Sequence, residues 1–353
     1  MEIKADLKKS KTKENRSSQE TTGVLKYKYN PKPEFEQRMN SLLELSGSNE
    51  KDKEAYWEIV HKEPINSIRC NTLKIKPQEL KKRLEKLGWK IQQPLKDKGY
   101  EEIMIIENNL LPGELGKTHE HILGYYYVQE ISSMLPIIAL KPTKQDILLD
   151  LCASPGSKTT QAASFMENSG SIIANDNNIG RIIILASNLE KCGVSNTIIT
   201  RRDGVQLCNR LSNIGIRFDK VLVDAPCSGE GTLRSSPKTF LMWNLKTIEY
   251  FGRQQRTLAS NALKLLKDGG EMIYSTCTHS PEEDEEVVQY LLDNFDIKLE
   301  KIELPIKTRP GILEWKNNKF SKEMQLCHRV YPQDNNTEGF FLCKIKKLSN
   351  EIK

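Results

Sequence analysis

Residues 147–166 read ILLDLCASPGSKTTQAASFM. An apolar run predicts a strand over Ile147–Cys152, and a helical pattern follows over Ser157–Met166. The turn between the two consists mainly of small residues. In such a turn the backbone can approach a ligand closely, and the free N–H groups at the start of the helix suit a negatively charged group. The stretch therefore predicts the first strand, turn and helix of an α/β domain. Taken alone, the turn is either a ligand site or a plain tight turn between strand and helix.

The alternation of strand and helix continues along the chain. The other expected strands are Ser171–Asn175, Asn196–Thr200, Lys220–Asp224 and Glu271–Ser275, and the other expected helices are Ile179–Lys191, Thr247–Leu266 and Glu282–Asn294. Strands separated by helices of this length predict a mostly parallel, doubly wound sheet. The expected fold class is therefore α/β and Rossmann-like, with ligands beyond the carboxyl ends of the strands.

The sequence before this domain has a different pattern. Residues 1–29 are rich in Lys and Ser and predict a disordered basic tail. Residues 30–118 mix helical and strand-like stretches and predict a smaller α+β module, whereas residues 119–348 are expected to form the α/β domain. The helices expected before the first strand of the α/β domain are Glu34–Leu45, Gln78–Leu87 and Tyr125–Leu140, and the expected strands are Ser67–Cys70 and Glu102–Ile106.

Composition limits the classes of function. The chain has 353 residues and a net charge of +6, which attracts polyanions without identifying one. No apolar run reaches the roughly 18 residues that cross a bilayer, and the first residues lack the apolar block of a secretory signal. We therefore expect a cytoplasmic protein without a membrane partner. None of the eight cysteines forms a Cys-x-x-Cys pair, which argues against a metal site and predicts reduced thiols.

The turn also indicates the kind of ligand. Gly156-Ser157-Lys158-Thr159 resembles the end of a phosphate-binding loop, but that motif needs Gly directly before the Lys. The glycine-rich dinucleotide fingerprint is missing as well. A nucleoside triphosphatase and a dinucleotide enzyme are therefore disfavoured, which leaves a nucleoside ligand without a long phosphate chain.

Three carboxylates follow three successive strands, namely Asp176, Asp203 and Asp224. Asp176 lies beside the first turn, where it can accept hydrogen bonds from two ribose hydroxyls. Each Asp could instead cap the helix that follows it, but capping alone does not account for three in a row. The arrangement fits S-adenosylmethionine, whose ribose, adenine and methionine parts can each meet one strand end.

Two cysteines leave neighbouring strands at the same edge of the sheet. Cys227 lies in the sequence DAPCSG, which begins at Asp224, and Cys277 lies in the sequence STCT. Two buried core thiols are the alternative, but turn-forming sequence surrounds both. A thiolate that adds to carbon-6 of cytosine makes carbon-5 reactive toward a methyl donor, and Asp224 could hydrogen-bond or protonate N3 of that ring. The pair therefore predicts methylation of a pyrimidine carbon.

The motifs CASPGSKT, DAPCSG and STCT together resemble those of the NOL1/NOP2/Sun family of RNA cytosine-5 methyltransferases, and they occur in the family's order. Further matches are RCNTL from Arg69, YVQEISSM from Tyr127, RVYP from Arg329 and EGFF from Glu338. The resemblance covers nearly all the chain after the tail. It implies a class I S-adenosylmethionine-dependent methyltransferase domain and a smaller N-terminal module that is similar to RNA-recognition folds.

The resemblance also implies residue roles. Cys277 would form the covalent adduct with carbon-6, and Cys227 would assist release of the methylated base. The implied residues of the S-adenosylmethionine site are Cys152, Ala153, Ser154, Pro155, Gly156, Ser157, Lys158, Asp176, Arg181, Asp203 and Asp224. Many relatives have a second glycine where Ser157 stands, which changes the flexibility of the turn.

We expect the N-terminal module and the tail to hold the RNA, with a flipped or unstacked cytosine as the target. The basic residues of the module include Arg69, Lys74, Lys76, Lys81, Lys82 and Arg83, and most of those on the helix expected over Gln78–Leu87 should lie on a solvated face. Arg234, just past the Cys227 loop, is expected to contact phosphate. Transfer RNA is the favoured substrate and ribosomal RNA the alternative. A catalytically silent RNA-binding or ribosome-assembly factor on the same scaffold is the non-enzymatic alternative.

Overall fold

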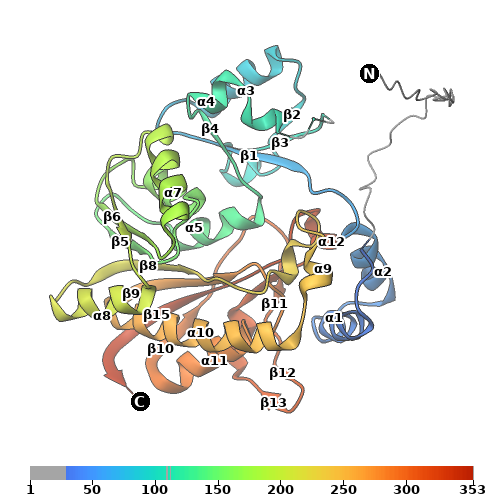
Figure 1. The fold of residues 1–353 in the computed structure, drawn as a ribbon, viewed down its shortest axis with the longest axis vertical. Helices are drawn as coiled ribbons and strands as arrows, with labels where there is room; N and C mark the ends of the chain where they lie inside the picture. The colour runs from blue at the N-terminus through green and yellow to red at the C-terminus, as the bar shows by residue number, and fades with distance from the viewer. Residues whose placement is uncertain (1–28, 109, 112, 353) are drawn as a thin grey trace, which may run out of the picture.

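A nine-stranded sheet organises the larger domain (Figure 1). The structure is a computed structural model that describes residues 29–108, 110–111 and 113–352, so the tail expected at 1–29 lies almost wholly outside the described residues. The strands are β5 Ile147–Asp150, β6 Ser171–Asp176, β7 Thr197–Arg201, β8 Phe218–Asp224, β9 Leu266–Thr276, β10 Phe295–Glu300, β11 Arg309–Pro310, β14 His328–Val330 and β15 Phe340–Ile352. Their order is β11-β14-β15-β9-β8-β5-β6-β7, and β10 pairs with β15.

The half of this sheet from β5 to β9 is parallel. β5 pairs with β6 and β8, β6 pairs with β7, and β8 pairs with β9, all in the same direction. β15 joins the other side of β9 in the antiparallel direction, and β14 joins β15 likewise. The parallel strands expected from the sequence are confirmed, and the complete sheet is mixed. The carboxyl ends of the parallel strands consequently meet at one edge.

Helices cover both faces of the sheet, as a doubly wound fold requires. One face carries α5 Leu135–Leu140, α6 Ser157–Phe165 and α7 Ile179–Cys192, and the other carries α8 Gly204–Asn213, α10 Leu245–Lys264 and α11 Glu285–Asn294. Successive strand residues point to opposite faces, so Leu149 packs in one core with Ala259 of α10, and Leu148 packs in the other with Ala162 of α6. No helix in the described part of the chain has the length and apolar character needed to span a membrane.

A four-stranded antiparallel sheet forms the centre of the smaller module. Its strands are β1 Asn66–Cys70, β2 Ile91–Gln92, β3 Ile103–Ile106 and β4 Tyr126–Val128, in the order β2-β3-β1-β4. Helix α3 Pro77–Lys86 covers one face with Leu80 and Leu84. The other face lies against the larger domain, where Ile103 of β3 packs in one cluster with Leu135 and Ala162. Both faces of the small sheet are therefore covered by protein.

The helix expected over Tyr125–Leu140 is wrong for its first half. Tyr126–Val128 is strand β4, in which Tyr126 lies opposite Cys70 of β1 and Val128 lies opposite Ile68. A 3-10 turn follows, and α5 begins only at Leu135. The Tyr-Tyr-Val sequence fits a pleated, half-buried surface, and pairing with a distant strand decides its structure.

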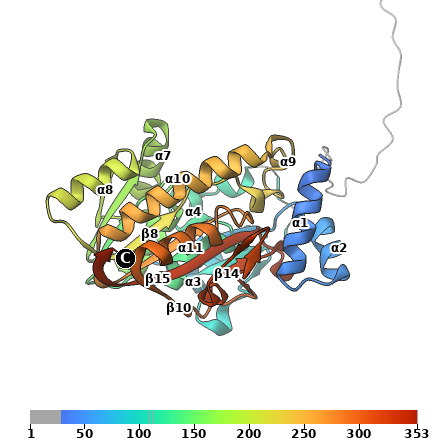
Figure 2. The ribbon, with the colours of Figure 1, turned by 90° about the horizontal axis from the view of Figure 1, so that it is seen from below.

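The first two helices pack on the larger domain and not on the small sheet. α1 Pro33–Leu45 and α2 Glu50–Ile59 stand side by side beyond one end of the large sheet (Figure 2). Phe35 of α1 meets Phe240 and Trp243 edge to face, with ring centroids 5.8 and 5.3 Å apart. The domain boundary expected between residues 118 and 119 stays a prediction. Contacts cross it in both directions, because α1 precedes it and packs on the larger domain, whereas β4 follows it and pairs with β1 of the small sheet.

Candidate active site

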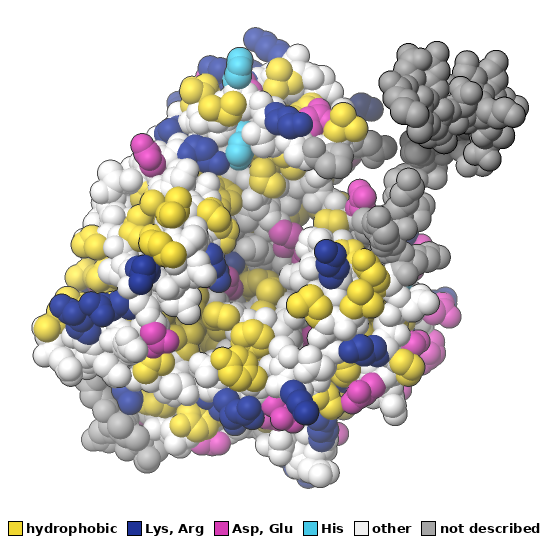
Figure 3. Space-filling view, in the orientation of Figure 1, with side chains coloured by type: hydrophobic (Ala, Val, Ile, Leu, Met, Phe, Trp, Pro, Cys, Tyr) yellow, Lys and Arg dark blue, Asp and Glu magenta, His cyan; other side chains and the backbone are white. Residues whose placement is uncertain are grey.

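The carboxyl ends of β5, β8 and β9 border a cavity of about 510 Å³ between the two domains. The molecule is visibly hollowed at this place, below the small module in Figure 3. Ser67, Tyr127 and Gln129 of the module form part of the wall. The residues singled out in the sequence that line this cavity are Cys152, Ala153, Ser154, Pro155, Ser157, Lys158, Asp224 and Cys277.

The two cysteines singled out in the sequence lie side by side. Cys227 Sγ is 3.2 Å from Cys277 Sγ. The two loops are also joined to each other, because the N–H of Gly231 donates to the carbonyl of Cys277 at 2.9 Å and the hydroxyls of Ser228 and Thr278 are 2.9 Å apart. Cys277 lines the cavity, whereas Cys227 does not. Of the two thiols, only that of Cys277 therefore faces the space where a ligand fits.

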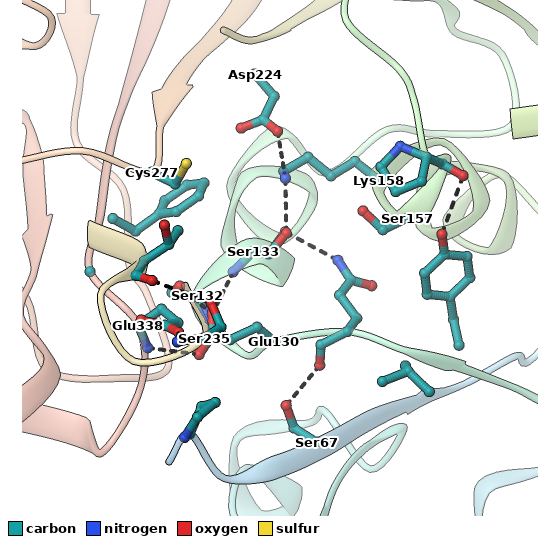
Figure 4. Close-up of a pocket in the computed structure, with 18 of the residues that line it drawn as sticks. Ser67, Glu130, Ser132, Ser133, Ser157, Lys158, Asp224, Ser235, Cys277 and Glu338 are labelled. Atoms are coloured by element: carbon teal, nitrogen blue, oxygen red, sulfur yellow. Dashed lines mark hydrogen bonds and ion pairs between the residues drawn. The ribbon is translucent and has the colours of Figure 1, made fainter. Parts of the chain in front are cut away.

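Asp224, at the end of β8, is fixed by two donors. Ser275 Oγ donates to Oδ1 at 2.8 Å, and Lys158 Nζ lies 2.7 Å from Oδ2. The same ammonium group donates to Ser133 Oγ at 2.9 Å and lies 5.5 Å from the centre of the Phe340 ring. Figure 4 shows Lys158 between Asp224 and Ser133, with the Cys277 sulfur directed toward the same space. The carboxylate, the ammonium group and the thiol thus share one wall of the cavity.

The small module holds the turn between β5 and α6. Arg69 of β1 donates to the carbonyl of Ser157 at 2.8 Å and to Thr160 Oγ1 at 2.8 Å. The hydroxyl of Tyr127 in β4 donates to the carbonyl of Pro155 at 3.2 Å. Arg69 is buried, and this burial lowers its pKa to about 10. Its side chain therefore faces the larger domain and not solvent. Arg69 was named from the sequence among the basic residues of the module that was expected to hold the RNA.

A second cavity, of about 210 Å³, lies beyond the ends of β6 and β7. Asp176, Arg181 and Asp203 line it, and Cys152 lines both cavities. Arg181 Nη2 lies 3.2 Å from Asp176 Oδ2. Asp203 also caps α8, because its Oδ1 accepts the N–H of Gln206 at 3.0 Å. The residues expected around S-adenosylmethionine are therefore divided between two adjoining spaces.

Gly156 lines neither cavity and has a structural place in the turn. Its φ of +102° lies in the left-handed region, directly before the first residue of α6. A Cβ at this position would lie 2.9 Å from a methyl carbon of Leu185 in α7. The glycine therefore allows both the sharp turn and the close approach of α7.

Arg234 is not available to a phosphate group, so this expectation is wrong. The side chain is 2% exposed. Its guanidinium group donates to the carbonyls of Lys62, Glu63 and Thr337 at 3.2, 2.7 and 2.9 Å. Arg234 thus ties the segment before β1 to the segment before β15, and burial takes it away from solvent.

Burial alters the ionisation of groups around the thiols. The pKa of Cys227 is raised well above its usual range by the hydrogen bond with Cys277, by burial and by the negative charge of Glu283. Burial raises the pKa of Asp150, at the end of β5, to about 7, although Thr159 Oγ1 donates to this carboxylate at 2.7 Å. Cys227 therefore keeps its proton at neutral pH and can donate it in a hydrogen bond to the neighbouring sulfur.

Several residues of the cavity were not identified from the sequence. Ser133 and Phe340 contact the ammonium group of Lys158. Glu130 and Glu338 line the wall, and burial raises the pKa of both carboxyl groups. All four belong to the motifs YVQEISSM and EGFF, so the signal that could have found them was present in the sequence.

Comparison with known families decides the affiliation of the chain. Residues 137–346 match the family described as 16S rRNA methyltransferase RsmB/F. The chain belongs to the RsmB/F family. Residues 32–131 match the family described as the N-terminal domain of 16S rRNA methyltransferase RsmF. The expected affiliation with the NOL1/NOP2/Sun methyltransferases is thereby confirmed, and the two matches extend over both domains of this RsmB/F member.

Two curated relatives differ in how much of their length this RsmB/F member spans. The tRNA (cytosine(49)-C(5))-methyltransferase of Pyrococcus abyssi is 40% identical over 90% of this chain and 98% of its own length. The ribosomal RNA small subunit methyltransferase F of Aliivibrio salmonicida is 39% identical over 82% of this chain and 60% of its own length. The chain thus spans nearly all of the first relative and less than two thirds of the second.

Solved structures show the same architecture. A methyltransferase homolog protein from Pyrococcus horikoshii superposes with a TM-score of 0.72 at 32% identity, over 88% of this chain and 99% of that one. NSun6 from Pyrococcus horikoshii with SFG superposes with a TM-score of 0.74 at 25% identity, over 88% and 97% of the two chains. The Rossmann-like methyltransferase fold expected from the sequence is therefore confirmed.

Proposed function

We propose that this RsmB/F member is an S-adenosylmethionine-dependent RNA methyltransferase that forms 5-methylcytosine. The observation that carries the proposal is the pair of thiols 3.2 Å apart, one of which faces a cavity that Asp224 and Lys158 also line. Carbon-5 of cytosine is a poor nucleophile until a thiolate adds to carbon-6, so this reaction needs a cysteine beside the base. The names of the relatives support the same reaction.

Cys277 is the group that attacks. Its sulfur faces the cavity, and the proton that the raised pKa keeps on Cys227 can stabilise a thiolate at Cys277 through a hydrogen bond. In the attack, an electron pair of Cys277 Sγ forms the bond to carbon-6, and the ring electrons move toward carbon-5 and N3. Cys227 is less suited to attack, because it holds its proton and does not line the cavity.

Asp224 and Lys158 bind the polar edge of the ring. Cytosine presents an amino donor and the acceptor N3 on this edge, and the two side chains present a carboxylate and an ammonium group 2.7 Å apart. The carboxylate can accept from the amino group while the ammonium group donates to N3, where addition at carbon-6 places negative charge. Both partners are held by further bonds, so little reorganisation is needed during the reaction.

S-adenosylmethionine fits the two adjoining cavities. Asp176 is buried beside the smaller cavity, and each of its oxygens has one hydrogen-bond or ion-pair partner, which leaves a second lone pair for a ribose hydroxyl. Asp203 and Arg181 border the same space, whereas residues 152–158 lead into the larger one. The bound cofactor would supply the methyl group for carbon-5 from its sulfonium centre. Cys152, which lines both spaces, marks where its nucleoside and amino-acid parts would meet.

Cys227 assists the release of the methylated base. Loss of the proton from carbon-5 to solvent water restores the ring double bond, and the electron pair of the bond between Cys277 Sγ and carbon-6 returns to the sulfur as a thiolate. The Cys227 thiol lies 3.2 Å from the departing sulfur, where it can donate a hydrogen bond to the thiolate that leaves. The chemistry thus ends with both cysteines in their starting states.

Transfer RNA is the proposed substrate. The support is that the transfer-RNA enzyme of Pyrococcus abyssi is 40% identical over 90% of this chain, whereas the ribosomal-RNA enzyme of Aliivibrio salmonicida is 39% identical over 82%. Ribosomal RNA is the alternative substrate. A silent RNA-binding or assembly role has no need of a cysteine pair or of the Asp224–Lys158 ion pair.

The test is incubation of the purified protein with methyl-labelled S-adenosylmethionine and separate pools of transfer and ribosomal RNA. We expect label in 5-methylcytidine from transfer RNA, and Cys277→Ala should abolish it while cofactor binding in calorimetry stays intact. Label found only in 5-methylcytidine from ribosomal RNA would make ribosomal RNA the substrate in place of transfer RNA. A complete lack of label in 5-methylcytidine from either pool would contradict the proposed reaction and leave the binding role.

A further inference from the structure

Two buried side chains hold the loop that carries Cys227 from both sides. Gln255 of α10 donates through Nε2 to the carbonyl of Pro226 at 2.8 Å. The N–H of Ser228 donates to Glu283 Oε2 at 2.9 Å, and Gln255 Nε2 donates to the same oxygen at 2.9 Å. The residues directly before and after Cys227 are thus tied to one amide and one carboxylate. This arrangement fixes the position of the thiol.

Glu283 is an unusual residue to find at this depth. It is 0% exposed, and its Oε1 has no hydrogen-bond partner in the part of the chain that the structure describes. Burial raises the pKa of Glu283 to about 7, although Ser228 and Gln255 donate to it. A buried carboxylate is costly unless it is well paired, and its two donors are both neutral. Stability alone therefore gives no reason for a carboxylate here.

The negative charge of Glu283 acts on the neighbouring thiol. It raises the pKa of Cys227, after the hydrogen bond with Cys277 and burial, which are the larger causes. The other titratable or charged groups around the two cysteine loops include Tyr274, Asp284, Glu230, Asp224 and Lys158, and Arg38 and Arg329 lie beyond Glu230 and Asp284. Each of these cations is paired with another carboxylate: Lys158 with Asp224 at 2.7 Å, Arg38 with Glu282, and Arg329 with Glu285. Above about pH 7, where Glu283 is ionised, its negative charge therefore acts on the sulfur of Cys227 without a cation of its own to offset it.

We propose that Glu283 is a positioning residue for Cys227: with Gln255 it fixes the loop that carries this thiol, and its negative charge keeps the proton on Cys227 while Cys277 attacks. The catalytic part of this inference rests on the proposed function, whereas the effect on the thiol does not. With the proton held on Cys227 Sγ, the free electron pair is at Cys277 Sγ, the sulfur that faces the cavity. Without the charge, the two sulfurs would share the proton and a smaller fraction of Cys277 would be ready to attack.

The variant Glu283→Gln separates charge from shape. Both donors to Glu283 reach the same oxygen, so the amide oxygen of the variant can keep both bonds while its NH₂ group takes the place of the unpartnered oxygen. The background is Cys277→Ala, so that Cys227 has no sulfur partner. Alkylation of Cys227 by iodoacetamide is followed over a series of pH values by peptide mass spectrometry. This measurement needs neither RNA nor cofactor.

With Glu283 in place, the midpoint of Cys227 alkylation should lie above the roughly 8.5 of a free cysteine. Glu283→Gln should lower this midpoint by about one pH unit, which makes alkylation below the midpoint about tenfold faster. Glu286→Gln is the matched control, because it makes the same chemical change three residues further on, in α11. The carboxylate of Glu286 pairs with Arg256 at 2.8 Å and has no contact with the Cys227 loop in the described part of the chain. The control should leave the midpoint where it was.

An unchanged midpoint in Glu283→Gln, or an equal shift in Glu286→Gln, would overturn the proposal. Should Glu283→Gln fail to fold, as judged by circular dichroism, the Cys277→Ala protein still decides the matter. A Cys227 midpoint at or below roughly 8.5 with Glu283 present would then overturn the proposal.

Catalysis supplies the second measurement. Above about pH 7, where Glu283 is ionised, Glu283→Gln should slow single-turnover methylation by at most about tenfold, the limit set by a one-unit change in the pKa of Cys227, and leave the KM for RNA unchanged because Glu283 does not line the cavity. In a Cys227→Ala background the same substitution should have no further effect on adduct formation, since the thiol on which it acts is gone. A further loss of adduct formation in that background would show that Glu283 acts by stabilising the fold and not through Cys227. If no RNA is methylated but the alkylation midpoint shifts, the proposed function fails and the effect of Glu283 on the thiol stands.

Discussion

Gly231→Ala tests how closely the two cysteine loops must pack. Gly231 links them, because its N–H donates to the carbonyl of Cys277 at 2.9 Å and its own carbonyl accepts from the N–H of Gly339 at 2.8 Å. A Cβ here would lie 2.4 Å from the Gly339 oxygen and 2.8 Å from the Cys277 oxygen, whereas ordinary contacts begin at 3.4 Å. Both obstacles are backbone atoms, so the loop of Gly231 must move by about 1 Å from the Gly339 segment and by about 0.6 Å from the Cys277 loop.

A displacement of this size should act on the chemistry more than on the fold. Misplacement by about 1 Å costs about 100-fold in rate, so we expect kcat to fall by that factor. Overpacking should lower the free energy of unfolding by about 1–3 kcal/mol. Affinity for S-adenosylmethionine should be unchanged, because Gly231 lines neither cavity. Single-turnover methylation, urea unfolding and calorimetric titration with the cofactor measure the three quantities.

Gly116→Ala is the matched control for this substitution. It makes the same chemical change at an exposed position where a Cβ would have no atom within 4 Å, so activity and stability should stay the same. Full activity and unchanged stability in Gly231→Ala would refute the close packing of the two loops. A loss of activity matched by an equal loss of cofactor affinity would show that the substitution disturbs the whole larger domain and not the cysteine loops alone.

Three further substitutions test other parts of the site. Cys227→Ala should accumulate an enzyme–RNA adduct that survives denaturing electrophoresis, and an adduct that accumulated in Cys277→Ala instead would reverse the two roles. Arg234→Met should lower the free energy of unfolding in urea by about 3 kcal/mol, because one buried and two partly buried carbonyls lose their donor, and should leave RNA affinity unchanged. Weaker RNA binding at full stability would make Arg234 a phosphate contact after all. Asp150 has its pKa raised from 3.8 to about 7, so it binds a proton more tightly in the folded chain and its contribution to stability falls as pH rises through that interval. Asp150→Asn should flatten this decline in a series of urea titrations, and an unaltered decline would assign it to other groups.

The parallel half of the large sheet was predictable because its signals are local. In this half, each unit of strand, turn and helix occupies one continuous stretch of sequence from Ile147 onward, and small or turn-forming residues mark where one element ends and the next begins. The antiparallel strands β10, β14 and β15 were not identified. Residues 340–343 are all buried, so the alternation that marks a half-exposed strand is absent, and β15 is defined by its pairing with β9 far along the chain.

The candidate site divides in the same way. Asp224, Cys227 and Cys277 could be placed near one another because parallel strands end at one edge of a sheet. The contacts of Arg69 with the turn could not be foreseen, because they depend on how the two domains dock. Arg234 was misjudged for a related reason: a basic residue after a loop reads as exposed, and only tertiary packing shows the carbonyls that surround it.

The small sheet that lies face down on the larger domain makes the two parts one cooperative unit. Ile103 of β3 shares an apolar cluster with Leu135 and Ala162, so detaching the module would uncover that surface in both pieces. Heat or denaturant should accordingly melt them in a single transition. Anyone exchanging N-terminal modules between relatives to alter RNA preference would need to transplant the buried face intact, Arg69 and Tyr127 included, or the cofactor turn would lose its anchors.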